Sequence, residues 1–286
     1  MKKTFLIALA ATALAAPAYA DHHGMSKAEH HKIHKEHSER LAKILADPAR
    51  GADAKRDQYR HPAETFEFFR LHPDHVIGEY APGGAWVSRI LGRYVNEKGK
   101  YTGLYFGTKS HFSDQQKAGI AANIAKFPAD VAAVSGRPAT DFNAFSLSEV
   151  PEGAKGSFDR IIVMRMLHNM MNWNIADSEI KAMRDLLKDD GLLGIEQHRA
   201  KADAPFSYSN GTKGYMREAD IIKFMEVNGF DLVAKSEINA NPKDSANWPD
   251  GVWTLPPALR LKDVDRAKYE AIGETDRMTL LFKKRP

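Results

Sequence analysis

The sequence predicts an α/β fold with a parallel sheet, and two observations carry this prediction. From Tyr59 onward, segments with helical periodicity alternate with short apolar segments of strand length, which is the pattern of a parallel sheet covered by helices. The first apolar segment leads into a Pro82-Gly83-Gly84 turn that opens a helix, as in many ligand-binding α/β sheets. The chain has 286 residues and no cysteine, so its core must be stable without disulfides.

Seven segments have the composition of strands, and five helices are expected between them. The expected strands are His75–Glu79, Tyr101–Phe106, Val131–Ser135, Arg160–Met164, Leu192–Glu196, Phe230–Ile238 and Arg277–Lys283. The expected helices are Pro62–Phe69, Ala85–Val95, Asp114–Ala125, Ser178–Leu187 and Arg217–Asn228. The last two strands follow a helix that stops at Gly229, so five α/β units precede a final pair of strands.

The first twenty residues have the three parts of a secretory signal peptide. Lys2 and Lys3 form a basic start, residues 4–16 are apolar, and Ala18-Tyr19-Ala20 is a small-x-small cleavage site. The apolar run is shorter than the roughly 20 residues that a membrane anchor needs. We therefore expect residues 1–20 to be removed before Asp21, which would give a periplasmic or secreted protein with no membrane span.

The charge balance argues against nucleic acid and anionic membranes as partners. Without Lys2 and Lys3 the chain keeps 39 basic residues against 37 acidic ones, and no block of basic residues stands out. The oligomeric state is open.

Residues 21–57 differ from the remainder, because six of the twelve histidines lie between His22 and His37. Ser26 could cap a helix that runs to about Ala46, where Asp47-Pro48 would end it. We expect a His-rich helical extension and linker over residues 21–57, ahead of a main domain at residues 58–286.

Cleavage before Asp21 would create an amino terminus with a histidine in third place. The amine, two amide nitrogens and the His23 imidazole could then bind Cu(II) or Ni(II) in a square plane. His22, His30 and His34 lie in the same segment and could add ligands. The alternative is a solvated, His-rich extension that binds no specific metal.

The turn after the first expected strand has the features of a ligand-binding loop. Glycines let a ligand approach the backbone, and the following helix offers free N–H groups that suit a carboxylate. Glu79, at the end of the strand, could pair with a ligand ammonium or order the loop. The G-x-G-x-x-G spacing of dinucleotide sites is absent, because Ala81, Gly83 and Ala85 occupy the aligned positions.

Several blocks of the sequence resemble class I S-adenosylmethionine-dependent methyltransferases, and in particular a family of predicted exported bacterial methyltransferases. The blocks are Tyr59–Glu64, Glu79–Trp86, Arg165–Asn169, Gly194–Ala200, Ser236–Pro242, Trp253–Pro257 and Asp276–Met278. The resemblance implies a Rossmann-like sheet of seven strands with helices on both faces and an antiparallel final pair. It also implies S-adenosyl-L-methionine as cofactor.

The same resemblance implies which residues hold that cofactor. They are Glu79, Pro82, Gly83, Gly84 and Ala85 of the loop, Asp141 near the adenine, and Arg165. Two departures from the family stand out. Ala85 replaces a usual third glycine, and no acid follows Phe106, where related enzymes hold the ribose hydroxyls.

Polar residues follow the fourth and fifth expected strands, whose carboxyl ends meet at one edge of a parallel sheet. His168 is a candidate general base, because an unperturbed imidazole has a pKa of about 6.5. Glu196 and His198 are further catalytic candidates. The alternatives are that His168 only caps a helix, that Glu196 forms an internal ion pair with Arg165 or Arg199, or that His168, Glu196 and His198 hold a metal.

Two functions therefore stand side by side. The first is a methyltransferase that acts on a small-molecule acceptor in the periplasm, favoured by Glu79 and the glycine turn. The second is a non-catalytic periplasmic binding protein on the same fold, which could bind metal through its His-rich amino terminus. The missing acid after Phe106, and export away from an obvious S-adenosylmethionine supply, favour the second.

Overall fold

A computed structural model describes residues 27–108 and 112–286, and its centre is one mixed sheet of seven strands. The strands lie in the order β3-β2-β1-β4-β5-β7-β6, and β7 runs antiparallel to both β5 and β6. This confirms the expected sheet with its antiparallel final pair. The strands are β1 (Val76–Tyr80), β2 (Lys100–Tyr105), β3 (Phe142–Ser146), β4 (Phe158–Met164), β5 (Leu187–His198), β6 (Phe230–Ser236) and β7 (Arg277–Lys284).

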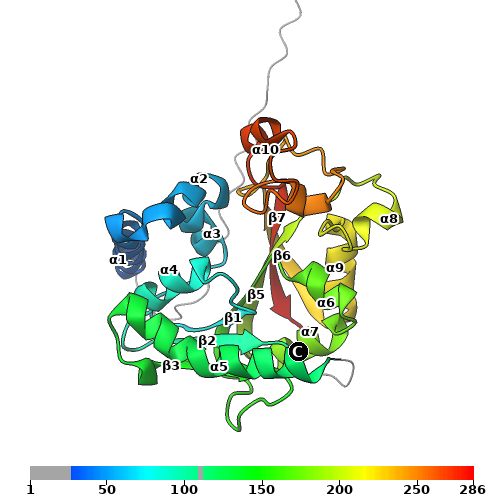
Figure 1. Cartoon of the computed structure of the whole chain (residues 1–286). Coiled ribbons are helices and arrows are strands. Elements are labelled where there is room, and N and C mark those ends of the chain that lie inside the picture. The colour runs from blue at the N-terminus through cyan, green and yellow to red at the C-terminus, as the bar shows by residue number, and fades with distance from the viewer. Residues whose placement is uncertain (1–26, 109–111) are drawn as a thin grey trace, which may run out of the picture.

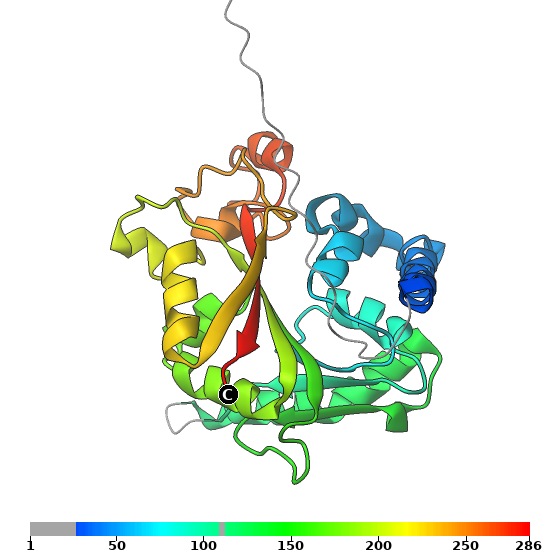
Figure 2. The same ribbon diagram turned by 180° about the vertical axis from the view of Figure 1, so that it is seen from behind.

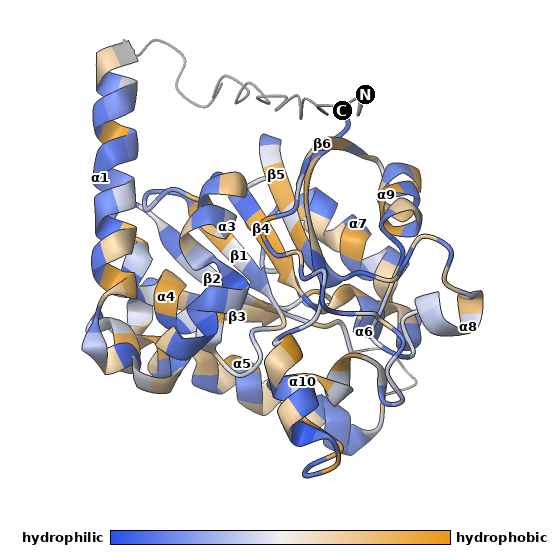
Figure 3. Ribbon diagram, turned by 90° about the horizontal axis from the view of Figure 1, so that it is seen from above, coloured by the Kyte–Doolittle hydropathy of each residue, from blue (hydrophilic) through white to orange (hydrophobic). Residues whose placement is uncertain are grey.

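Helices cover both faces of this sheet, as Figures 1 and 2 show from opposite sides. One face carries α1 (Lys27–Leu45), α3 (Pro62–Phe68), α4 (Trp86–Tyr94) and α5 (Asp114–Ser135), and the other carries α6 (Leu167–Asn172), α7 (Ala176–Leu186) and α9 (Glu218–Val227). Each face has its own apolar core, and the central strands between them are strongly apolar (Figure 3). Shorter elements complete the chain: η1 (Pro48–Arg56), α2 (Asp57–Arg60), η2 (Ala139–Asp141), α8 (Phe206–Ser209), η3 (Gly251–Thr254) and α10 (Arg266–Ile272).

The third strand is the one element that the sequence placed wrongly. Residues 131–135 form the last turns of α5, which continues through Pro128 to a left-handed Gly136 cap. Phe127 and Val131 are buried four residues apart, so the helical apolar face extends past the proline. The strand itself is β3, a short edge strand whose weak apolar pattern gave no signal.

The amino-terminal segment packs onto the domain through α1, which occupies nearly the expected range. Leu41 and Ile44 are buried against α3 and α4, and the Arg40 guanidinium donates a hydrogen bond of 2.6 Å to the Tyr94 carbonyl at the end of α4. Over the described ranges, no helix combines the length and the apolar character that a membrane crossing requires. The expected signal peptide, together with His22 and His23, lies outside the described residues.

Candidate cofactor and active site

The loop after β1 has the backbone of a glycine loop even where glycine is missing. Ala81, Gly84 and Ala85 have φ angles of 48°, 59° and 54°, in the left-handed region that favours glycine. A Cβ built on Gly83 would meet only the Ala81 carbonyl oxygen, at 3.6 Å, and one on Gly84 would meet nothing within 4 Å. A side chain at either glycine would therefore have open space around it.

A cleft of about 470 Å³ lies between this loop and α5. Its walls include Pro82, Gly83, Gly84 and Ala85, together with Ser88 and Arg89 of α4 and Phe127 and Val131 of α5. No side chain caps the start of α4, so its first backbone N–H groups remain available to a ligand. An anionic group would gain from these N–H groups and from the helix dipole.

Glu79, near the end of β1, is buried beside this loop. Its side chain is 4% exposed and accepts hydrogen bonds from the hydroxyls of Ser88, at 2.9 Å, and Tyr101. Burial raises the pKa of Glu79 to about 7. Its carboxylate therefore links the end of β1 to α4 and β2.

Arg165 and Glu196 form the internal ion pair that the sequence left open as an alternative. Arg165 Nη1 lies 2.7 Å from Glu196 Oε1, and Glu196 is fully buried. Arg277 of β7 approaches the same carboxylate at 3.1 Å and reaches Glu274 at 2.8 Å. Arg60 of α2 then binds Glu274 at 3.0 Å, so a buried chain of charges joins β4, β5, β7 and α2.

The two histidines of the predicted active site lie together, with ring centroids 5.6 Å apart. Gln197 contacts His168 and the neighbouring loop: its amide nitrogen donates to the Gly214 carbonyl at 2.8 Å, and its amide nitrogen and oxygen lie 3.1 Å and 3.4 Å from His168 Nδ1. Burial lowers the pKa of His168 to about 4 and that of His198 well below its usual range.

These contacts change two expectations. Glu196 belongs to the arginine pairs, so it does not join His168 and His198 in a metal site. Among the residues that the structure describes, the one compact group of possible metal ligands lies elsewhere. Asp141 precedes β3, at the opposite edge of the sheet from the loop after β1, and pairs with Arg137 at 3.0 Å. The structure therefore does not bring Asp141 to this site.

Sequence reasoning missed several polar groups at the same edge. Hydroxyls of Thr108, Ser146 and Ser148 form a cluster after β2 and β3, with the two serine oxygens 2.9 Å apart. Buried Glu179 of α7 accepts a hydrogen bond of 3.0 Å from the Gly107 amide, which brings a carboxylate to the loop after β2. Only the tertiary structure shows that these groups lie close together, because α7 lies about 70 residues after β2 in the sequence.

Solved structures share this arrangement at low sequence identity. The [4+2]-cyclase SpnF is similar with a TM-score of 0.50 and 16% identity, over 79% of this chain and 81% of that chain. The MccD protein gives a TM-score of 0.50 and 9% identity over 78% and 95% of the two chains. An S-adenosylmethionine-dependent methyltransferase from Aquifex aeolicus gives a TM-score of 0.48 and 12% identity over 85% and 97%.

The fold is a Rossmann-like sheet of seven strands with an antiparallel final pair, and the two solved structures with a TM-score of 0.50 share it. The strand order with an antiparallel β7 agrees with the layout expected from the resemblance. No protein-family model matches the chain, and no curated protein does. One of the similar structures is named a cyclase, so the fold by itself does not fix the reaction.

Proposed function

We propose that this protein is an S-adenosylmethionine-dependent methyltransferase that acts on a small-molecule acceptor. The loop after β1 carries the proposal: it keeps left-handed backbone at Ala81, Gly84 and Ala85 and opens onto a cleft of about 470 Å³. Holding two alanines in the left-handed backbone region costs free energy, and a ligand that needs this backbone shape would account for that cost.

The residues present fit the cofactor in part. The amino end of α4 and the Gly83-Gly84 backbone suit the carboxylate of the methionine moiety. The hydroxyl cluster of Thr108, Ser146 and Ser148 offers hydrogen bonds where related enzymes place an acid for the ribose. When bound, the cofactor would supply a methyl group on a cationic sulfur, and the protein would position the acceptor in line with it.

The acceptor side favours a small anion. Arg165, Arg277 and Arg60 outnumber the two carboxylates, Glu196 and Glu274, that they pair with. A cavity of about 280 Å³ beside this network is lined in part by Arg277 and Glu274. A buried excess of positive charge is stabilised by an anionic ligand, and an acceptor that is already anionic needs no general base.

We also propose that the protein acts outside the cytoplasm, because residues 1–20 have the composition of a cleavable signal peptide. Intact-mass analysis of the periplasmic fraction tests this proposal. A chain that begins at Asp21 supports export, and a chain that keeps Met1 in the cytoplasmic fraction contradicts it.

Calorimetric titration with S-adenosylmethionine and S-adenosylhomocysteine tests the cofactor. Gly83→Val should abolish binding, because the new side chain has room within the protein and would occupy only the ligand space. Gly119→Val is the matched control, since Gly119 is exposed on α5 with open space around it. Equal binding by wild type and Gly83→Val would exclude this loop as the site.

A non-catalytic binding protein on the same fold is the second candidate. Two observations within residues 27–108 favour it: no carboxylate follows β2 along the chain, and Glu79 is engaged inside the protein. Failure of both cofactors to bind the folded wild-type protein would support this candidate.

A further inference from the structure

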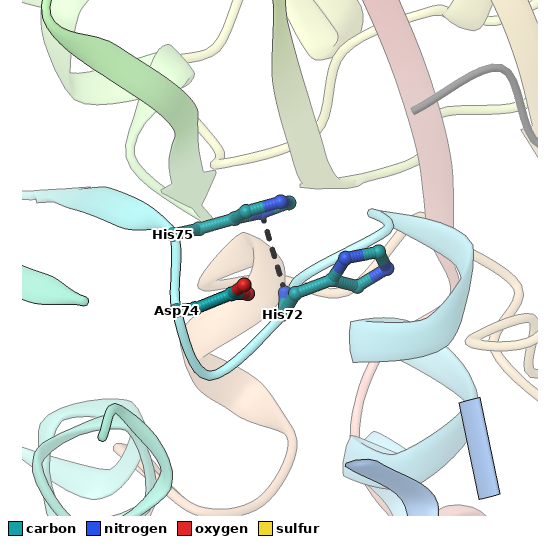
Figure 4. A group of neighbouring side chains, drawn as sticks. All are labelled: His72, Asp74 and His75. Carbon is teal, nitrogen blue, oxygen red and sulfur yellow. Dashed lines mark hydrogen bonds between the residues drawn. The ribbon is translucent and has the colours of Figure 1, made fainter. Parts of the chain in front are cut away.

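A group of possible metal ligands lies in the loop that leads into β1. One donor atom each from His72, Asp74 and His75 can be chosen so that all three lie within 4.8 Å of one another. Figure 4 shows the His75 and Asp74 side chains extending from the loop toward His72. The two imidazoles are stacked with centroids 4.5 Å apart, and the His72 backbone N–H donates to His75 Nδ1 at 3.3 Å.

The His-rich helix α1 adds a further imidazole to this group. The His37 ring centroid lies 4.9 Å from that of His72, although 35 positions separate them in the sequence. Beside them, a cavity of about 120 Å³ is lined in part by His34, His37, Glu67 and His72. His34, which the sequence also suggested as a metal ligand, lies 3.4 Å from Glu67. Two histidines of α1 therefore face the main domain.

Charges of both signs surround the loop. Of the two nearby cations, Lys188 pairs with Asp159 at 2.6 Å, whereas Arg160 donates to the uncharged Arg70 carbonyl at 3.0 Å and keeps its positive charge. Asp74 is exposed and brings a negative charge.

We propose that His72, Asp74 and His75, with His37 closing from α1, bind one divalent transition-metal ion of the zinc class. Imidazole nitrogens and a carboxylate oxygen are ligands that zinc prefers, at metal–ligand distances near 2.0–2.2 Å. The donor atoms would have to draw together to about 3.3 Å apart, which tetrahedral geometry implies. Asp74 is exposed, and both histidines belong to one short loop, so a small adjustment can provide this.

The bound metal would clamp the His-rich helix onto the domain. The loop precedes β1, whereas the candidate cofactor loop follows the same strand, so the two sites lie at opposite edges of the sheet. The site is therefore a structural one and does not depend on the proposed methyltransferase function. Metal binding would couple the position of α1 to the fold, because a metal that binds only the native state stabilises it.

Zinc titration of the chelator-treated full-length chain by calorimetry tests the site, with Co(II) as a spectroscopic probe. All chains carry His23→Ala, so that the amino terminus cannot form a square-planar site. The expected result is one zinc per chain and the visible band of four-coordinate Co(II). Asp74→Asn should weaken zinc binding at least about tenfold, and His75→Ala more strongly. Asp263→Asn, at an exposed position, is the matched control.

Hydrogen exchange tests the clamp separately. Zinc should slow amide exchange in α1, and His37→Ala should remove that effect while the remaining ligands still bind the metal more weakly. Asp74→Asn keeps the test valid if His75→Ala fails to fold. Zinc affinity unchanged by Asp74→Asn, or no zinc binding by the parent chain, would overturn the proposal.

Discussion

Replacing Glu79 by glutamine tests the role of the buried carboxyl behind the cofactor loop. Glutamine keeps an oxygen that can accept from Ser88 and Tyr101, so the hydrogen bonds of the site survive the change. It removes the ionisable group. The variant therefore resembles the wild-type protein in which Glu79 is protonated, and a comparison at several pH values isolates the free energy of ionising this one side chain.

The magnitude follows from the pKa in the folded protein. Burial raises the pKa of Glu79 from 4.5 to about 7, and each unit corresponds to about 1.4 kcal/mol. A raised pKa means that the folded state binds the proton more tightly than the unfolded state. The contribution to stability is then fully present below pH 4.5 and is lost as pH rises to 7, by about 3 kcal/mol in total.

Urea unfolding of both proteins from pH 4 to pH 8 measures this effect. The two should have similar free energies of unfolding near pH 4, and Glu79→Gln should be more stable by about 3 kcal/mol at pH 8. Glu64→Gln, at an exposed position on α3, should show no such divergence. A constant difference between Glu79→Gln and wild type across the range would refute the reasoning, because it would mean that Glu79 ionises normally.

The remaining predictions concern four other positions. Ala85→Gly should raise the free energy of unfolding by roughly 0.5–1 kcal/mol, since residue 85 is left-handed; thermal melts measure this. Arg277→Met should lower the free energy of unfolding by about 3–5 kcal/mol, because the buried Glu196 carboxylate keeps one arginine fewer; urea unfolding measures this decrease. His168→Ala should leave S-adenosylhomocysteine affinity unchanged in calorimetry and lower any turnover about tenfold through a lost hydrogen-bond donor. If residue 21 becomes the amino terminus, Cu(II) should give the visible band of a square-planar nitrogen site, and His23→Ala should remove it.

The sequence predicted the elements whose own residues have a strong apolar or turn pattern. Six of the seven strands and the turn at Gly83 follow from apolar runs and turn residues that lie side by side in the chain. The expected helix stopped at Ala125 and a strand was expected at residues 131–135, whereas α5 continues through Pro128 to Ser135. Local patterns cannot show that a proline is tolerated when the helix face on either side is buried.

The candidate site was harder to predict, because its contacts join distant segments. Glu79 and Arg165 were recognised from their positions at strand ends. The pair between Arg165 and Glu196 was foreseen as an alternative, but two further groups were not: Arg277, which opens the last strand and approaches Glu196, and Glu179, which reaches the Gly107 amide from a helix on the other face. The sequence pattern shows which side chains stand near the carboxyl edge, but only the packing of β7 and α7 decides which charges meet there.

The protonation states of the site bear on the chemistry that it can support. His168 and His198 are neutral at pH 7, because burial lowers the pKa of each, and the Gln197 amide occupies Nδ1 of His168. With its pKa lowered, His168 is a weak base and is poorly suited to remove a proton. Arg165 and Arg277 meanwhile supply positive charge at the same edge of the sheet. For the proposed methyltransferase, neutral histidines and an excess of arginine would suit an acceptor that is already anionic, is held by charge and needs no deprotonation.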